Sequence, residues 1–395
     1  MAYVPPHKRH SQGKFRPALT SEMLVPRFQR ALGSRSPVSN ANKVGMIVYG
    51  DHAINNWYSV ELDCDGHLPN HVHLEPVSVE AVEQRSGGKP LMLMNRNRFE
   101  ENATGTPWAT VAEKVLQDLQ SSFEILKNET DNKGLDQIKP TLVARFGNIL
   151  FHRTSSVGTI VSGRLEEAEL RRQRRSFYTN IPSSYMQNVL DKVVPKIGLD
   201  FEDEKEIYHV KLSDKTRPDS TISCKCNVTN DKSLMLYKVE LNAVRQMVND
   251  ISCLDKDLDL RIMLCRKMIL GGLSENELNR IRCLINSAVL DSNVKGGLRW
   301  PLGTDSGDRF AVIGVWHVSA KTYINQSVRL KVRHADRFDF RLGLGEVTQE
   351  VNLKLKKLVS LLQEHNATDD IVSETLKDNI KLIWDNFLCC EQFLK

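Results

Sequence analysis

The sequence predicts an α+β protein, in which an N-terminal α/β module is followed by a larger antiparallel β-meander with a charged face, closed by two C-terminal helices. Short segments of alternating apolar and charged residues, such as SVRLKVRH, predict the meander. Apolar residues at helical spacing after Thr106-Pro107, and again near the C-terminus, predict the helices. We divide the chain into a disordered basic arm (1–43), the α/β module (44–180) and the sheet domain with its C-terminal helices (181–395).

Turn residues and helical spacing define the elements of the N-terminal part. Asp, Asn and Gly residues separate apolar segments, which predicts short strands at 44–49, 57–62, 71–76 and 90–94. Thr106 as N-cap and Pro107 at the first helical position begin a helix that the polar stretch NETDNKG ends. The segment TLVARFGNILFH predicts a strand or a hairpin, and RLEEAELRRQRR and SSYMQNVLDKVV predict helices.

From about residue 205 the pattern is that of a β-meander interrupted by one helix. The predicted strands cover 207–212, 221–228, 234–241, 258–264, 298–301, 310–317, 326–334 and 337–344. The stretch SENELNRIRCLINSAVL predicts the interrupting helix. A two-residue link at Ala335-Asp336 predicts a hairpin between the last two strands. Apolar stripes that begin at Val351 and at Ile371 predict the closing helices.

Composition excludes several classes of protein. Hydrophobic residues make up 41% and charged residues 26%, as in a soluble globular protein. No stretch approaches the roughly 18 apolar residues of a membrane span, and the N-terminus lacks the apolar core of a signal peptide. We therefore expect a protein of the cytoplasm or nucleus without membrane contact. The eight cysteines lack CxxC and zinc-finger spacing, which predicts buried free thiols and no metal site.

Positive charge is concentrated in the N-terminal arm. Residues 1–43 hold eight basic side chains and one acidic one, a net charge of +7 against +5 for the whole chain. A basic arm on a nearly neutral body predicts contact with a polyanion, most often nucleic acid. The candidate polyanion-binding residues of the arm are Lys8, Arg9, Lys14 and Arg16.

A second basic pattern lies on the predicted C-terminal sheet. Because side chains alternate along a strand, Arg329, Lys331 and Arg333 share one face of their strand. Arg337 and Arg341 share a face of the next predicted strand. Lys211 and Lys225 also alternate with apolar residues in their strands. One interpretation is a solvated face with cross-strand ion pairs, and another is a polyanion-binding platform with salt-dependent affinity.

The alternation of charges also resembles tunnel-shaped triphosphatases, whose antiparallel strands point acidic and basic side chains inward. The resemblance implies that acids bind a metal and bases bind phosphates. Acidic residues are sparse here, and Asp257 and Asp259 come nearest to the Glu-x-Glu spacing of that family. No Walker loop, GxGxxG, GxSxG or helicase core is present, so we expect no cofactor and assign no catalytic residue.

Three other motifs have simpler interpretations. His67, His71 and His73 predict a group on a turn and a strand rather than a metal site. RRQRR after three glutamates predicts helical ion pairs, with nuclear import or RNA contact as the alternative. Trp300 and Trp316 are expected to pack in the core rather than to stack on a ligand.

The opening stretch YVPPHKR resembles the N-terminal YVPPHLR-like peptide of DEAD-box RNA helicases of the Ded1 type. That resemblance implies docking of Tyr3 to the cap-binding translation factor, although Lys8 stands where the family has leucine. A longer resemblance joins MAYVPPHKRH, IVYGDHAINNWYSVELD, HVHLEPVSVE and RHADRFDFRLGLGEV. Through these stretches the chain is similar to a plant protein family of unknown function, which implies an intracellular setting in a plant and no defined activity.

These observations leave three hypotheses, in order of preference. The first is a non-enzymatic protein that binds RNA, or RNA-associated proteins, through the arm and the Arg/Lys sheet face. The second is a protein–protein scaffold without a nucleic-acid role, in which Tyr3 matters more than the arm's charge. The third is a tunnel-type phosphate-handling enzyme, which requires the charged faces to converge inside a closed sheet around clustered acids.

Overall fold

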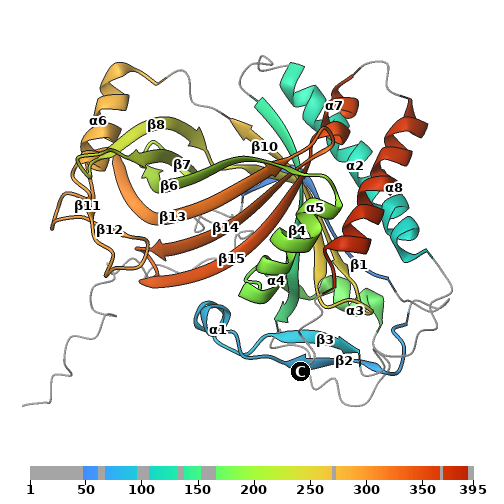
Figure 1. Cartoon of the computed structure of the whole chain (residues 1–395). Helices are drawn as coiled ribbons and strands as arrows, with labels where there is room; N and C mark the ends of the chain where they lie inside the picture. The colour runs from blue at the N-terminus through green and yellow to red at the C-terminus, as the bar shows by residue number, and fades with distance from the viewer. Residues whose placement is uncertain are drawn as a thin grey trace, which may run out of the picture.

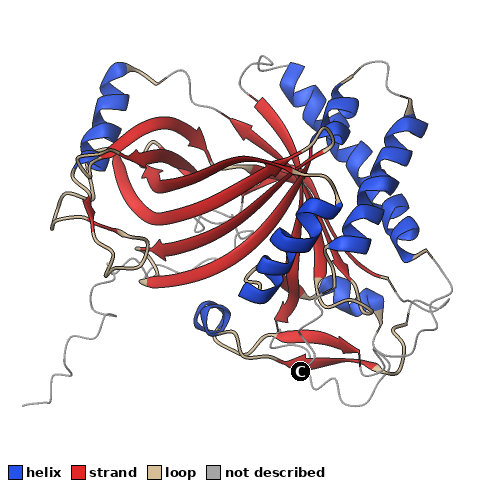
Figure 2. Cartoon of the chain, viewed as in Figure 1, coloured by secondary structure: helices blue, strands red, loops and turns tan. Residues whose placement is uncertain are grey.

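A large curved sheet with helices on its outer side forms the body of the molecule (Figures 1 and 2). The computed structural model describes residues 48–60, 67–95, 106–131, 138–152, 166–268, 273–364 and 368–389. The main strands are, in spatial order, β1 (Val48–Ser59), β9 (Val244–Ser252), β10 (Asp259–Met268), β4 (Ile138–His152), β15 (Leu344–Leu355), β14 (Val328–Asp339), β13 (Phe310–Ile324), β6 (Asp200–Asp214), β7 (Arg217–Val228) and β8 (Leu234–Leu241).

Neighbouring strands along this path are antiparallel, apart from the parallel pair of β1 and β9. Three short strands, β2 (Val72–Pro76), β3 (Leu91–Asn95) and β5 (Arg174–Tyr178), extend the sheet beside β4. The sheet curls so far that β8, the last strand of the path, contacts β10. The predicted α+β class, with its large sheet and two closing helices, is confirmed.

The first hydrophobic core lies between the helices and the outer face of β4, β10, β14 and β15 (Figure 2). The helices are α2 (Pro107–Asp131), α4 (Ser183–Asn188), the π-helical η5 (Val189–Val193), α5 (Val194–Lys196), α7 (Lys356–Gln363) and α8 (Asp369–Asn386). Every second residue of each strand enters this core, as Leu142, Ala144 and Phe146 do in β4. The Phe146 ring stacks on Phe387, with 5.0 Å between the ring centres.

A second core lies outside the other half of the sheet. Helix α6 (Glu275–Asn286) packs with Ile281 against β6, β7 and β13, whose outward residues include Val210 and Phe310. The short pair β11 (Val289–Leu290) and β12 (Leu298–Arg299) adds Leu298 to this core. A third, smaller cluster joins β2, β3 and β5 with α3 (Glu167–Arg172), and α1 (Glu80–Ser86) lies beside them (Figure 1).

Because both large cores lie outside the curl, the alternate residues of the same strands face its inner side. We call this inner side of β4, β6, β7, β10, β13, β14 and β15 the concave face. Cys224, Cys226, Cys253 and Cys265 are buried free thiols, as predicted, whereas Cys283 and Cys389 are free but exposed, so the prediction is wrong for these two. None of the described helices is long and apolar enough to cross a membrane.

The N-terminal and C-terminal parts of the chain meet in one sheet. Strand β4 lies between β10 and β15, and the first core combines Val115 of α2 with Val351 of β15 and Ile380 of α8. The domain boundary proposed at residue 180 stays a prediction.

Several predicted elements differ from those of the structure. The hairpin at Ala335-Asp336 is wrong, because β14 runs through both residues and the chain turns only after Asp339, where Gly343 adopts φ +64°. Val351 lies in β15 rather than in a helix, and α7 begins at Lys356. The continuous helix over RRQRR is also wrong, since α3 ends at Arg172 and β5 follows. Strand β9 and helix α1 were not predicted.

Helix α6 begins with a capping box that gives the first testable prediction. The Ser274 hydroxyl accepts a hydrogen bond from the Glu277 backbone, and the Glu277 carboxylate accepts one from the Ser274 amide at 2.7 Å. Replacing Ser274 by alanine should lower the free energy of unfolding by about 1 kcal/mol. Urea unfolding measures this, with Ser121→Ala at an exposed site inside α2 as the control. Equal stability of the two variants would contradict the prediction.

Candidate anion-binding site

The structure places four of the five sheet residues named from the sequence together on β14. Arg329, Lys331, Arg333 and Arg337 all lie on the concave face, at alternate positions of the one strand. Arg341 is separated from them, in the turn after β14, where its guanidinium Nη2 lies 2.7 Å from Asp339 Oδ2. The candidates Lys8, Arg9, Lys14, Arg16 and Tyr3 lie outside the described residues.

Five lysines from five different strands converge on the concave face. We call this set the lysine cluster: Lys211 in β6, Lys225 in β7, Lys267 in β10, Lys331 in β14 and Lys354 in β15. The charge of Lys225 acts on each of the other four and helps to lower their pKa values. Since β7 and β15 are far apart in strand order, only the curl of the sheet explains this proximity.

The cluster is poorly compensated by negative charge. Burial first, and the neighbouring cations second, lower the pKa values of Lys211, Lys331 and Lys354 to about 8. Lys225 pairs with Glu240 at 2.9 Å, and the same carboxylate also pairs with Lys238. Lys267, Lys331 and Lys354 form no ion pair with any residue that the structure describes. These three ammonium groups therefore add net positive charge to the concave face.

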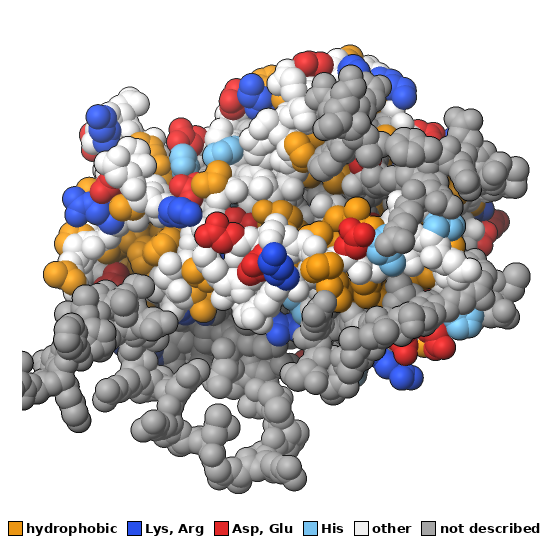
Figure 3. Space-filling model, turned by 90° about the horizontal axis from the view of Figure 1, so that it is seen from below, with side chains coloured by type: hydrophobic (Ala, Val, Ile, Leu, Met, Phe, Trp, Pro, Cys, Tyr) orange, Lys and Arg blue, Asp and Glu red, His pale blue; other side chains and the backbone are white. Residues whose placement is uncertain are grey.

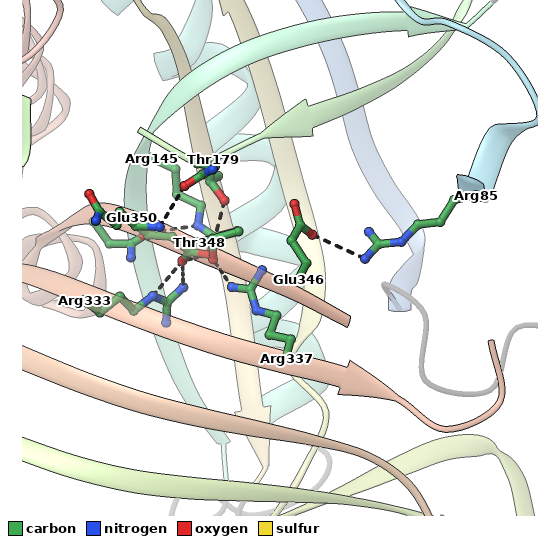
Figure 4. Close-up of polar contacts among 11 residues, drawn as sticks. Arg85, Arg145, Thr179, Arg333, Arg337, Glu346, Thr348 and Glu350 are labelled. Carbon is green, nitrogen blue, oxygen red and sulfur yellow. Dashed lines mark hydrogen bonds and ion pairs between the residues drawn. The ribbon is translucent and has the colours of Figure 1, made fainter. Parts of the chain in front are cut away.

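Beside the lysines lies a buried carboxylate that holds three arginines (Figure 4). Glu350, in β15, has a side chain only 1% exposed and is ion-paired with Arg145, Arg333 and Arg337. The hydroxyls of Thr179 and Thr348 donate to its Oε1 at 3.2 Å. Burial alone would raise the pKa of Glu350, but the three guanidinium charges outweigh it and hold the pKa well below the usual range.

We call Glu350 with these three arginines the Glu350 cluster. It carries three positive charges and one negative charge, so it adds to the positive potential of the concave face. Burial lowers the pKa of Arg145, and the Glu350 carboxylate partly offsets that effect. Its function within the face is to fix the directions of Arg333 and Arg337, because each is held by a charged hydrogen bond.

The two tryptophans singled out from the sequence, Trp316 and Trp300, lie in different surroundings. Trp316, in β13, was predicted to pack in the core, but it is 37% exposed and lies on the concave face. Lys211 Nζ lies 4.6 Å and Arg337 Cζ lies 5.1 Å from the centre of its ring. Trp300 does pack against the second core, and its Nε1 donates to the Leu284 carbonyl at 2.8 Å.

The imidazole of His209, on the concave face, is surrounded by cations. Burial, followed by the charges of Lys211 and Lys225, lowers the pKa of His209 to about 2, so this ring is neutral. Among the described residues there is no group of three or more His, Cys, Asp and Glu side chains that is able to hold a metal ion. His73, of the N-terminal histidine group, bonds to Glu75 at 2.5 Å.

Charge is distributed differently on the outer surface. Seen from below, the described part of the molecule shows acidic, basic and apolar side chains interspersed, without a large field of one sign (Figure 3). On the outer surface Glu206 pairs with His317 at 2.5 Å, while Arg329 of the concave face pairs with Glu202 at 2.7 Å. RRQRR is divided between α3 and β5, and Arg171 makes the expected helical ion pair with Glu167 at 2.6 Å.

Sequence reasoning missed three basic residues of the face. Lys354 was assigned to a helix, although Glu350, Asn352 and Lys354 alternate with apolar residues as a strand requires. Lys267 lies just beyond the predicted end of its strand. Arg145 is one charged residue in an apolar segment, and nothing local to it indicates a buried partner 205 positions away.

Comparison with known proteins gives a family and distant structural similarities. The family model described as "Domain of unknown function (DUF7903)" matches residues 41–387. No curated protein matches the chain significantly.

Among solved structures, the Pct1 RNA triphosphatase of S. pombe aligns with a TM-score of 0.42 and 13% identity, over 70% of this chain and 90% of that one. The RNA triphosphatase domain of a mimivirus mRNA capping enzyme aligns with a TM-score of 0.31 and 9% identity, over 68% and 97% of the two chains. A putative adenylate cyclase from Bacillus halodurans gives a TM-score of 0.23 and 10% identity, over 54% and 91%. Similarities at these scores do not define a shared activity.

Proposed function

The chain belongs to the DUF7903 family, whose description assigns no function, and we propose from the geometry of the concave face that the protein binds RNA there. In this proposal the lysine cluster contacts phosphate groups and the Glu350 cluster supplies fixed arginines beside them. The protein acts as an RNA- or RNP-associated binding protein. The basic arm predicted at residues 1–43 adds a second cationic segment to the same chain.

The observation that carries the proposal is the set of unpaired lysines. Partial burial first, and repulsion between neighbouring cations second, lower the pKa values of Lys331 and Lys354 and raise the free energy of the folded protein in which they are charged. An RNA phosphate placed among Lys267, Lys331 and Lys354 would offset the repulsion. Such a contact releases counterions from the RNA, so the affinity should fall steeply as salt is added.

Binding of a labelled single-stranded RNA, followed by fluorescence anisotropy across a salt series, tests the proposal. The double variant Lys331→Gln/Lys354→Gln should bind roughly tenfold more weakly, and its salt slope should be shallower by about two. The control is Lys196→Gln/Lys357→Gln, which removes two exposed lysines from α5 and α7. It should bind like the unchanged protein.

Two outcomes would contradict the proposal. In the first, both double variants bind RNA with equal affinity. In the second, deletion of residues 1–43 abolishes binding while the lysine cluster proves irrelevant, which would place the function in the arm alone. Absence of any RNA binding would favour the protein scaffold, and exchange of Tyr3 would then be the next experiment.

A tunnel-type phosphate-handling enzyme is the second candidate. It is favoured by the convergence of basic side chains from β6, β7, β10, β14 and β15 on one inner face. Such an enzyme also requires carboxylates that are free to bind a metal ion, whereas Glu240 and Glu350 are each ion-paired with two or more cations. Release of inorganic phosphate from an RNA carrying a 5′-triphosphate, abolished by Lys331→Gln/Lys354→Gln, would support this alternative.

A further inference from the structure

Trp316 is an exposed aromatic residue in the middle of the basic concave face. Its position in β13 is directly opposite His209 in β6 and Arg337 in β14, so all three share that face. A tryptophan with more than a third of its surface open to water has not contributed all of its apolar area to folding. It is therefore available to a ligand that enters the face.

Next to Trp316 lies a small apolar cluster that belongs to neither outer core. It consists of Val318, Ala320 and Ala335, which are 5%, 3% and 1% exposed. Val318 is two positions from Trp316 on the same strand and is directly opposite Ala335. These three side chains are almost fully buried, which leaves Trp316 as the apolar side chain beside them that a ligand can reach, with lysines of the cluster on both sides. A ligand that fits this part of the concave face carries an apolar, planar group as well as phosphates.

The orientation of the Trp316 ring is held by two cations of unequal mobility. Arg337 is fixed by its ion pair with Glu350, whereas Lys211 has a neutral partner, the Asn242 side chain at 3.0 Å. The Lys211 ammonium is therefore the easier of the two to displace from the ring. Once displaced, it remains within the lysine cluster, where a phosphate of the ligand is expected.

We propose that Trp316 stacks on a nucleobase of the bound RNA, so that the concave face binds a nucleotide unit and not phosphate alone. This inference rests on the proposed function. The base takes the place of the Lys211 ammonium against the ring, and that ammonium then pairs with a phosphate. Stacking on an aromatic ring tolerates every base, because each presents a π-face, so little sequence preference is expected.

A comparison of RNA with an abasic oligomer of equal length tests the role of Trp316. The full chain should bind the RNA roughly tenfold more tightly than the abasic oligomer, as expected for the loss of one stacked base. Trp316→Leu should bind both oligomers with the affinity that the unchanged protein has for the abasic one. Trp316→Phe should keep most of the preference. Phe201→Leu removes an aromatic side chain that is 58% exposed and contacts Tyr323, and it should keep all of the preference.

The outcomes separate this inference from the function on which it rests. Equal affinity of the unchanged protein for the two oligomers would overturn base stacking and leave phosphate binding intact. A Trp316→Leu variant that weakens both oligomers equally would also overturn it, because Trp316 would then only position Lys211 and Arg337. Failure of both oligomers to bind the unchanged protein would reject the proposed function and the inference together.

Discussion

Replacement of Glu350 by alanine is expected to lower the free energy of unfolding by about 3–5 kcal/mol. The substitution leaves Arg145, Arg333 and Arg337 without the carboxylate that they share, while all three stay on a largely buried face. It also removes the acceptor of the Thr179 and Thr348 hydroxyls. Urea unfolding followed by circular dichroism measures the change from the shift of the midpoint.

The matched control for this experiment is Glu202→Ala. Glu202 also pairs with an arginine of β14, but the side chains of this pair are about one third exposed. An exposed ion pair contributes roughly 0–1 kcal/mol, so the control should be nearly as stable as the unchanged protein. A Glu350→Ala variant no less stable than this control would show that the Glu350 cluster does not hold the sheet together.

RNA affinity is expected to fall steeply as the pH rises above about 8. In the free protein, burial and neighbouring cations lower the pKa values of Lys331 and Lys354 from the ordinary 10.5 to about 8. A bound phosphate favours the charged form and raises these pKa values again, so binding above pH 8 takes up protons. For each such lysine the affinity should fall by about tenfold per pH unit.

The stability of the free protein should increase over the same rise in pH. A lysine whose folded-state pKa is lowered destabilises the fold at pH values below about 8, and this effect is relieved as the pH rises from about 8 towards 10.5.

Anisotropy titrations at about pH 7 and pH 9.5, at constant ionic strength, measure the loss of RNA binding. In Lys331→Arg/Lys354→Arg both side chains stay charged, and the dependence on pH should be much weaker. A pH-independent affinity of the unchanged protein would refute the prediction.

The sequence predicts strands reliably where apolar and polar residues alternate and where turn residues bound the segment. That is the case for β8. The alternation in SVRLKVRH also places Arg329, Lys331 and Arg333 on one face as the structure has them, although the predicted strands within β13 and β14 ended too early, at residues 317 and 334. Strand β15 was missed beyond its first residue, in part because Val351, Leu355, Leu358 and Leu362 also fit helical spacing. A strand that passes directly into a helix presents both periods in one stretch.

The candidate site was only partly predictable, because curvature is a property of the whole sheet. Alternation shows that Lys225 and Lys354 lie on polar faces of their strands, but it does not show that these faces meet. Their mutual repulsion depends on the curl that brings β7 towards β15. Trp316 was misassigned for a related reason, since an aromatic residue in a strand is usually buried. Here the two cores lie outside the curl, so the inward residue stays exposed.

The position of β4 has a consequence for the way the chain folds. This strand is synthesised early, yet its partners β10 and β15 come much later, and Arg145 and its partner Asn352 are 207 positions apart. Pairings of such high contact order form slowly, because a long loop must close before any of them is made. On the ribosome, β4 therefore cannot complete its pairing until β10 and β15 have emerged. The nascent chain should accordingly depend on chaperones, and refolding from denaturant should be slow for a protein of this size.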